Sequence, residues 1–230
     1  MISISDINEV TDYIETSKKC TNIETENQMS DLEVDSFWKT EFENVRNDKE
    51  LNSYDRLQSE SFNRSTEEID IDFDIDEELL LTLENFKPEK WEVMNEAQRM
   101  VAIKVVVQET AERLGIDKVP NVALYDGDIN DCGYFNPDSN EINLNRNLFS
   151  NPIELLDTAM HELRHAFQRI RADKSETWED KLYAYNYDNY ITPFELPDGN
   201  YLFFTDYMKQ YVEVDARAFA SKITEALNNE

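Results

Sequence analysis

The chain has 230 residues, of which 40% are hydrophobic and 11% aromatic, and its 50 acidic against 22 basic residues give a formal net charge of −28. This charge repels nucleic acid phosphates and anionic membrane surfaces, and no long apolar run is present, so we expect neither a nucleic acid partner nor a membrane span. The first residues lack the features of a secretory signal peptide, and two cysteines, Cys20 and Cys132, are too few for a disulfide framework, so we expect a cytoplasmic protein.

The first 87 residues differ in composition from the rest. All four glycines and all six prolines lie at or after Pro88, so this part lacks the usual turn residues. Because acidic, Ser- and Asn-rich sequence buries little apolar surface, we predict an acidic N-terminal extension over 1–87, mostly helical or partly disordered, and a second domain over 88–230. The alternating segment IDIDFDID (residues 69–76) fits either an edge strand with an acidic outer face or an unfolded segment that becomes ordered on a partner.

From Pro88 onward the pattern of elements predicts a compact α+β domain. Helical apolar spacing covers residues 96–116 and is followed by a glycine stop at Gly115. Residues 121–126 read as a strand, and the segments CGYF (132–135) and EINLN (141–145) flank a turn and predict a hairpin. We therefore expect a helix, then a small mixed sheet with a hairpin, then further helices.

A helix with clear start signals follows the hairpin. Asn151 can cap it, Pro152 suits the first helical position, and Glu154 can reach back as in a capping box. The segment LDTAMHELRHAFQRI therefore lies well inside a helix, and it contains both histidines of the chain.

The two histidines, His161 and His165, are four residues apart, with Glu162 directly after the first. Positions i and i+4 lie on one face of a helix, so both imidazoles can approach one metal ion. Glu162 lies about 100° round the helix and can reach a water molecule there without ligating the metal itself. This HExxH pattern is typical of zinc hydrolases, in which the glutamate is a general base.

A third zinc ligand must be a carboxylate, because no further histidine exists. The last predicted helix, from Thr205 to the end of the chain, carries Glu213 and Asp215 on opposite edges of its apolar face. Periodicity alone does not decide between them.

The aromatic-rich segment 171–205, between these two helices, reads as a cleft wall or lid. A tyrosine from this part of the chain is a candidate donor to a reacting oxygen, although packing explains such residues equally well. The tyrosines considered are Tyr183, Tyr185, Tyr187, Tyr190, Tyr201 and Tyr207.

The motif HELRHAFQ, followed downstream by YMKQYVEVDA, resembles the zincin superfamily of zinc metallopeptidases, and more closely its gluzincin-like members, whose third ligand is a glutamate on a later helix. Small phage-borne, toxin-type and ImmA/IrrE-like peptidases have a similar outline. The segment GYFNPDSNEINLN also resembles the hairpin that often precedes the active-site helix there. The resemblance covers roughly residues 95–228 and implies a zincin-like fold for this part.

The resemblance also implies roles for individual residues. His161, His165 and Glu213 correspond to the zinc ligands, and Glu162 corresponds to the general base. Thermolysin-like gluzincins often carry an acid four residues after the ligand glutamate, whereas this chain has an arginine there, at position 217. Asp215 is then either a residue that orients a ligand or the third ligand itself. Tyr207 recurs in the resembled pattern and is a weaker catalytic candidate.

We therefore expect a zinc-dependent peptidase that hydrolyses a protein or peptide substrate, with residues 1–87 used for recognition or regulation. An alternative is an acidic interaction or inhibitor protein, such as a DNA mimic, that uses a zincin scaffold and binds a basic protein through its acidic N-terminal region. A further alternative is a zymogen in which that region covers the cleft and Cys20 reaches the metal.

Overall fold

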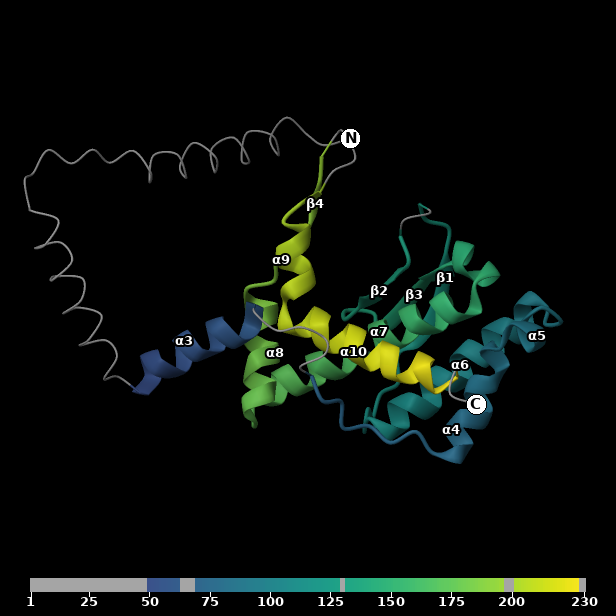
Figure 1. Ribbon diagram of the computed structural model, residues 1–230, viewed down its shortest axis with the longest axis horizontal. Coiled ribbons are helices and arrows are strands. Elements are labelled where there is room, and N and C mark those ends of the chain that lie inside the picture. Colours follow the sequence, from purple (N-terminus) through teal and green to yellow (C-terminus); the bar gives the residue numbers. More distant parts are fainter. Residues whose placement is uncertain (1–48, 63–68, 129–130, 197–200, 228–230) are drawn as a thin grey trace, which may run out of the picture. The chain divides into compact units, whose positions relative to one another are not determined.

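The structure is a computed structural model, and it describes residues 49–62, 69–128, 131–196 and 201–227 (Figure 1). The chain divides into two compact units, Met1–Asn52 and Ser53–Glu230. The second unit has a mixed α+β fold, as expected. Most of the acidic extension, including Cys20 and most of the surface expected to bind a basic partner, lies outside the described residues.

The second unit begins before Pro88, where we expected the domain to start. The helix α3 (Lys49–Phe62) leads into it, and α4 (Glu77–Leu83), η2 (Glu84–Phe86) and α5 (Pro88–Trp91) follow. Leu79, Leu83 and Phe86 in this region are fully buried in the main core. The described residues 71–86 therefore have a structural role, because their apolar side chains complete the core of the following domain.

Among the described residues, the segment 69–76 joins neither sheet, so it is not the edge strand that was one of the two structures its alternation allowed. Its apolar side chains nevertheless face inward. Ile71 and Phe73 are buried, and the Phe73 ring packs edge-on against Phe219 at 5.1 Å. Lys222 Nζ also donates a hydrogen bond of 2.6 Å to the Ile71 carbonyl. The alternation thus reflects an inner and an outer face without a hydrogen-bonded ladder.

The predicted helix, hairpin and sheet are all present. Helix α6 (Glu96–Arg113) ends just before Gly115, whose φ of 71° suits glycine. Strands β1 (Asn121–Tyr125), β2 (Gly133–Asn136) and β3 (Glu141–Asn145) form a sheet in the order β1-β3-β2, with β1 parallel and β2 antiparallel to β3. After β3, η3 (Arg146–Ser150) leads to the histidine helix.

Glycine at position 133 permits the close approach of β2 to its neighbours. A Cβ atom there would lie 2.7 Å from the Asn143 carbonyl oxygen and 2.9 Å from Thr158 Cγ2. Any larger residue would push β2 away from β3 and from the histidine helix. The tight fit matters for function because β2 also contacts Glu162, as described below.

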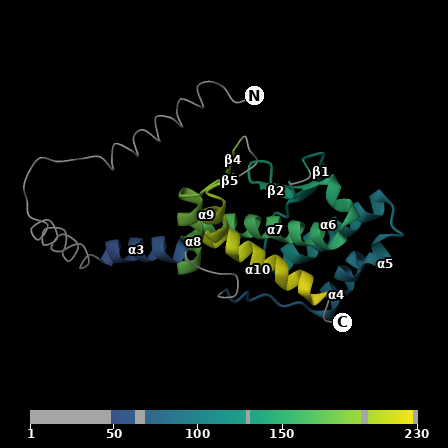
Figure 2. The same ribbon diagram turned by 45° about the horizontal axis from the view of Figure 1, so that its top comes forward.

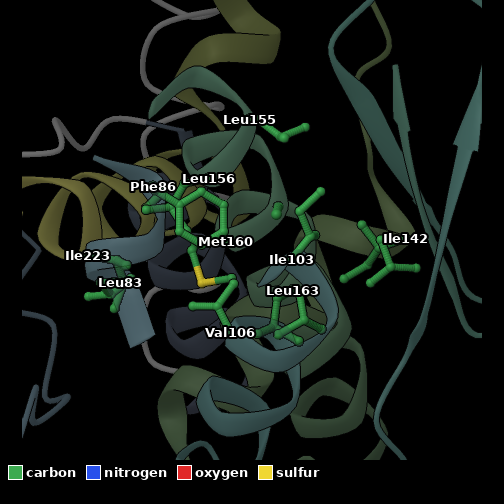
Figure 3. Close-up of a cluster of buried hydrophobic side chains, with 14 of the residues drawn as sticks. Leu83, Phe86, Ile103, Val106, Ile142, Leu155, Leu156, Met160, Leu163 and Ile223 are labelled. Atoms are coloured by element: carbon green, nitrogen blue, oxygen red, sulfur yellow. The ribbon is translucent and has the colours of Figure 1, made fainter. Parts of the chain in front are cut away.

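The histidine helix α7 (Pro152–Lys174) lies at the centre of the unit, packed against α10 (Tyr211–Ala226), α8 (Trp178–Asp188), α6 and the sheet (Figures 1 and 2). Asn151 caps α7 by accepting a hydrogen bond from the Glu154 amide, as predicted. Figure 3 shows the core around α7, with side chains from six elements: Leu83, Phe86, Ile103, Val106, Ile142, Leu155, Leu156, Met160, Leu163 and Ile223.

The expected single C-terminal helix is two helices, α9 (Phe204–Lys209) and α10, separated at Gln210. Gln210 has extended backbone angles, and its buried side chain accepts a hydrogen bond from the Ile191 amide and donates one to the Ile191 carbonyl. These bonds fix Ile191, which lies shortly before strand β4 (Phe194–Glu195). Strand β4 pairs with β5 (Tyr201–Leu202) in an antiparallel arrangement. None of the described helices combines the length and apolar character needed to cross a lipid bilayer.

Candidate metal centre

Helices α7 and α10 bring His161, His165 and Glu213 together, with ligand-type atoms of all three within 4.8 Å of one another. The two histidine Nε2 atoms lie 3.0 Å apart. Glu213 Oε2 lies 3.4 Å from His161 Nε2, and Glu213 Oε1 lies 3.4 Å from His165 Nε2. Two nitrogens and a carboxylate therefore converge from two helices on one point.

The donor set fits a cation. The Glu213 side chain is only 1% exposed, and its Oε2 has no hydrogen-bond partner of good geometry within the described part of the chain. The Arg217 guanidinium lies 3.8 Å from this oxygen, which is too far for a hydrogen bond, and a metal ion would provide the close partner that a buried carboxylate oxygen needs. Burial alone would raise the pKa of Glu213, but the contact with His161 and the charges that the two imidazoles can carry outweigh it and lower this pKa to about 2.

Gln168 orients His165. Its side-chain nitrogen donates to the Val212 carbonyl at 2.8 Å and to Asp215 Oδ2 at 2.7 Å. This leaves Gln168 Oε1 as an acceptor, 2.8 Å from His165 Nδ1. The proton of a neutral His165 therefore belongs on Nδ1, and the lone pair on Nε2 is free for a cation. Tyr187 supports the same arrangement with a 2.9 Å hydrogen bond to Gln168 Oε1.

Asp215 is buried and is held by Arg164 in a two-pronged ion pair, with Nε 2.7 Å from Oδ2 and Nη2 2.9 Å from Oδ1. Asp215 Oδ2 also accepts hydrogen bonds from Gln168, at 2.7 Å, and from the Tyr183 hydroxyl, at 3.2 Å. Of the two acids that the sequence left open, Glu213 is therefore the one beside both histidines. Asp215 reaches His165 only through Gln168.

Glu162 lines a cavity of about 240 Å³ that His165 and Glu213 also line. The Glu162 side chain is nearly buried, and its Oε2 accepts a 2.8 Å hydrogen bond from the Phe135 amide of β2. Burial, with a smaller effect from the nearby Glu213 charge, raises the pKa of Glu162 to about 7, against the opposing effects of His165 and the Phe135 amide. A carboxylate of this kind is suited to proton transfer.

Tyrosines form the opposite wall of this cavity. Tyr187, Tyr190 and Tyr207 all line it, and the Tyr190 hydroxyl donates a 2.5 Å hydrogen bond to Glu213 Oε1. Burial and the Glu213 charge raise the pKa of both Tyr190 and Tyr207, so both are neutral donors at physiological pH. Tyr207 lines the cavity, and its catalytic role stays a prediction, whereas composition alone could not single out Tyr190 as the Glu213 partner.

A larger cavity of about 520 Å³ lies between the segment 69–76 and α7. Its three arginines already have carboxylate partners: Arg113 pairs with Asp76, Arg164 with Asp215, and Arg171 with Asp180. Unlike the smaller cavity, it contains no group of residues arranged to hold a metal ion among those that the structure describes.

Comparisons with models of protein families, with curated proteins and with solved structures found no match for this chain.

Proposed function

We propose that the chain is a zinc-dependent peptidase with a zincin-like active site. The observation that carries the proposal is the convergence of His161, His165 and the buried Glu213, beside a cavity that His165, Glu213 and Glu162 line. Two imidazoles and one carboxylate form a ligand set that zinc uses in hydrolases, where a fourth position stays open for water or substrate. His161, His165 and Glu213 would hold the ion, and zinc bound there would polarise the scissile carbonyl and acidify a water molecule.

Glu162 is proposed as the general base. Its carboxylate takes one proton from the attacking water as the water oxygen bonds to the scissile carbonyl carbon. The same proton then passes to the amide nitrogen, the C–N bond breaks, and the products are a carboxylate and an amine. The Phe135 amide, which donates to Glu162 Oε2, holds the other side of this carboxylate in place.

Tyr190 and Tyr207 have different proposed roles. Tyr190 already donates to Glu213 and therefore orients a ligand. Tyr207 lines the same cavity, where its neutral hydroxyl lies near Glu213 and Tyr190, and its proposed role is to donate to the oxygen that becomes negative during the reaction.

The test compares wild type with Glu162→Gln on a mixed peptide library, with cleavage followed by mass spectrometry. We expect Glu162→Gln to keep its zinc and to lose cleavage by about 10²- to 10⁴-fold, because a general base contributes roughly that factor. Glu154→Gln, an exposed change near the start of the same helix, serves as the matched control and should cleave like wild type. Equal cleavage by Glu162→Gln and wild type, with zinc bound to both, would remove the peptidase proposal.

A further inference from the structure

One cation faces the candidate active-site cavity. Arg169 is the only lysine or arginine among the described residues that line it, and it lies one helical turn beyond His165 on α7. The other charged groups of the lining are the carboxylates Glu162 and Glu213. Arg169 is therefore placed to meet whatever part of a substrate lies next to the scissile bond.

The guanidinium of Arg169 differs from those of the other two arginines on α7. Arg164 is paired with Asp215, and Arg171 with Asp180. Arg169 has a ring contact, 3.5 Å from its central carbon to the centre of the Tyr187 ring, and no carboxylate partner in the described part of the chain. Arg169 is also exposed, so its guanidinium can be reached from solvent as well as from the cavity.

The contact with Tyr187 keeps this arginine ready for a ligand. Stacking on an aromatic face fixes the plane of a guanidinium, while its N–H groups point outward along the edge. Tyr187 is itself held by its hydrogen bond to Gln168. The planar donor edge matches a carboxylate, which it can bind through two parallel hydrogen bonds.

We infer that Arg169 binds a carboxylate of the substrate beside the scissile bond, and this inference rests on the proposed function. The carboxylate is either an aspartate or glutamate side chain or the free C-terminus of a peptide, because both present the same two oxygens. The acidic surface of the protein repels such substrates at long range, so a local cation is needed to select them.

The experiment uses a mixed library of synthetic peptides made in matched forms, with Asp or Asn at each varied position and with a free or amidated C-terminus. The full-length protein, Arg169→Gln and Arg169→Lys digest this library, and mass spectrometry gives the relative kcat/KM of each matched pair. Lys174→Gln is the matched control, because it removes one positive charge from an exposed site on the same helix outside the cavity.

Wild type and Lys174→Gln should prefer the carboxylate form by about tenfold or more, the effect of a hydrogen-bonded charge pair. Arg169→Gln should bring the ratio of the two kcat/KM values close to one. Arg169→Lys should give an intermediate ratio, because lysine keeps the positive charge but lacks the planar pair of N–H donors. Discrimination between Asp and Asn identifies a side chain as the ligand, whereas discrimination between free and amidated ends identifies the C-terminus. Equal ratios for wild type and Arg169→Gln would overturn the inference.

A second readout separates this inference from the proposed chemistry. The Glu162→Gln protein, with and without Arg169→Gln, is immobilised and used to capture the same library, and the retained peptides are identified. Carboxylate forms should be enriched only when Arg169 is present. Such enrichment without cleavage by wild type would refute the peptidase and support the carboxylate site, whereas retention that is independent of the carboxylate would refute the site. Matching denaturation curves would show that the variants are folded.

Discussion

His165 Nδ1 lies 2.8 Å from Gln168 Oε1, and the Gln168 nitrogen is committed to Val212 and Asp215. The orientation of one imidazole at the candidate centre is thus set by a buried glutamine whose own direction is fixed by the facing helix. Through Gln168 the centre is connected to the ion pair between Asp215 and Arg164. The metal affinity should therefore depend on residues that do not touch the metal.

Replacing Gln168 with alanine should weaken zinc binding by about 10- to 100-fold, which is typical for the loss of a group that orients a metal ligand. The reason is that His165 loses the acceptor that places its proton on Nδ1. Competition with a chromogenic chelator measures the affinity. Gln108→Ala, at an exposed site on α6, should bind zinc like wild type. Equal zinc affinity for Gln168→Ala and wild type would show that the glutamine does not orient the ligand.

Asp215→Asn should lower the free energy of unfolding by about 3–5 kcal/mol, because it leaves the buried Arg164 without its charged partner. Glu96→Gln removes the acid of the exposed pair with Arg146 and should cost less than about 1 kcal/mol. Urea denaturation measures both values. At saturating zinc, Asp215→Asn should still bind close to one ion per chain. Loss of the ion from a protein that remains folded would instead make Asp215 a ligand.

The two cavity tyrosines should respond differently to removal of their hydroxyl groups. Tyr190→Phe removes the hydrogen bond to Glu213 Oε1 and should weaken zinc binding by roughly tenfold or more. Tyr207→Phe should lower kcat by about 10²-fold with a smaller loss of zinc affinity than Tyr190→Phe, because its proposed partner is the oxygen that becomes charged in the reaction. Chelator competition and peptide cleavage, measured on both variants, check the contrast. Identical effects of the two changes would contradict the division of roles.

Asp180 gives a prediction about stability and pH. Burial tends to raise its pKa, but hydrogen bonds from the Thr177 amide and Arg171 outweigh burial and lower it. A carboxylate with a lowered pKa stabilises the fold above its unfolded value of about 3.9, and this contribution is lost as the pH falls through the folded pKa. The difference in unfolding free energy between wild type and Asp180→Asn should therefore be constant from about pH 7 to 5 and shrink below about pH 4.

Local signals in the sequence predicted much of the fold. The Asn151 cap, the hairpin and the glycine stop at position 115 all depend on neighbouring residues, and each is present. The start of the domain and the break at Gln210 were not predicted. Both depend on distant contacts, namely the packing of Leu83 and Phe86 in the core and the bonds from Gln210 to Ile191. Periodicity cannot reveal contacts of this kind.

At the candidate centre, too, features that depend on neighbouring residues could be predicted and those that depend on distant contacts could not. The spacing of His161, Glu162 and His165 on one helix could be read directly from the chain. The choice of Glu213 came from a motif, and no periodicity argument distinguished it from Asp215. Gln168 gave no signal, because a glutamine inside a helix is most often solvated, and its role depends on α10 packing against α7.

The zinc-to-protein ratio of the full-length protein, purified without added metal and analysed by mass spectrometry of the elements, tests the central claim most directly. The account predicts close to one zinc ion per wild-type chain, a similar ratio for Glu162→Gln, and a ratio near zero for His165→Ala and for Glu213→Ala. A wild-type chain that binds no zinc even when the metal is supplied, or a His165→Ala chain that binds as much as wild type, would contradict it.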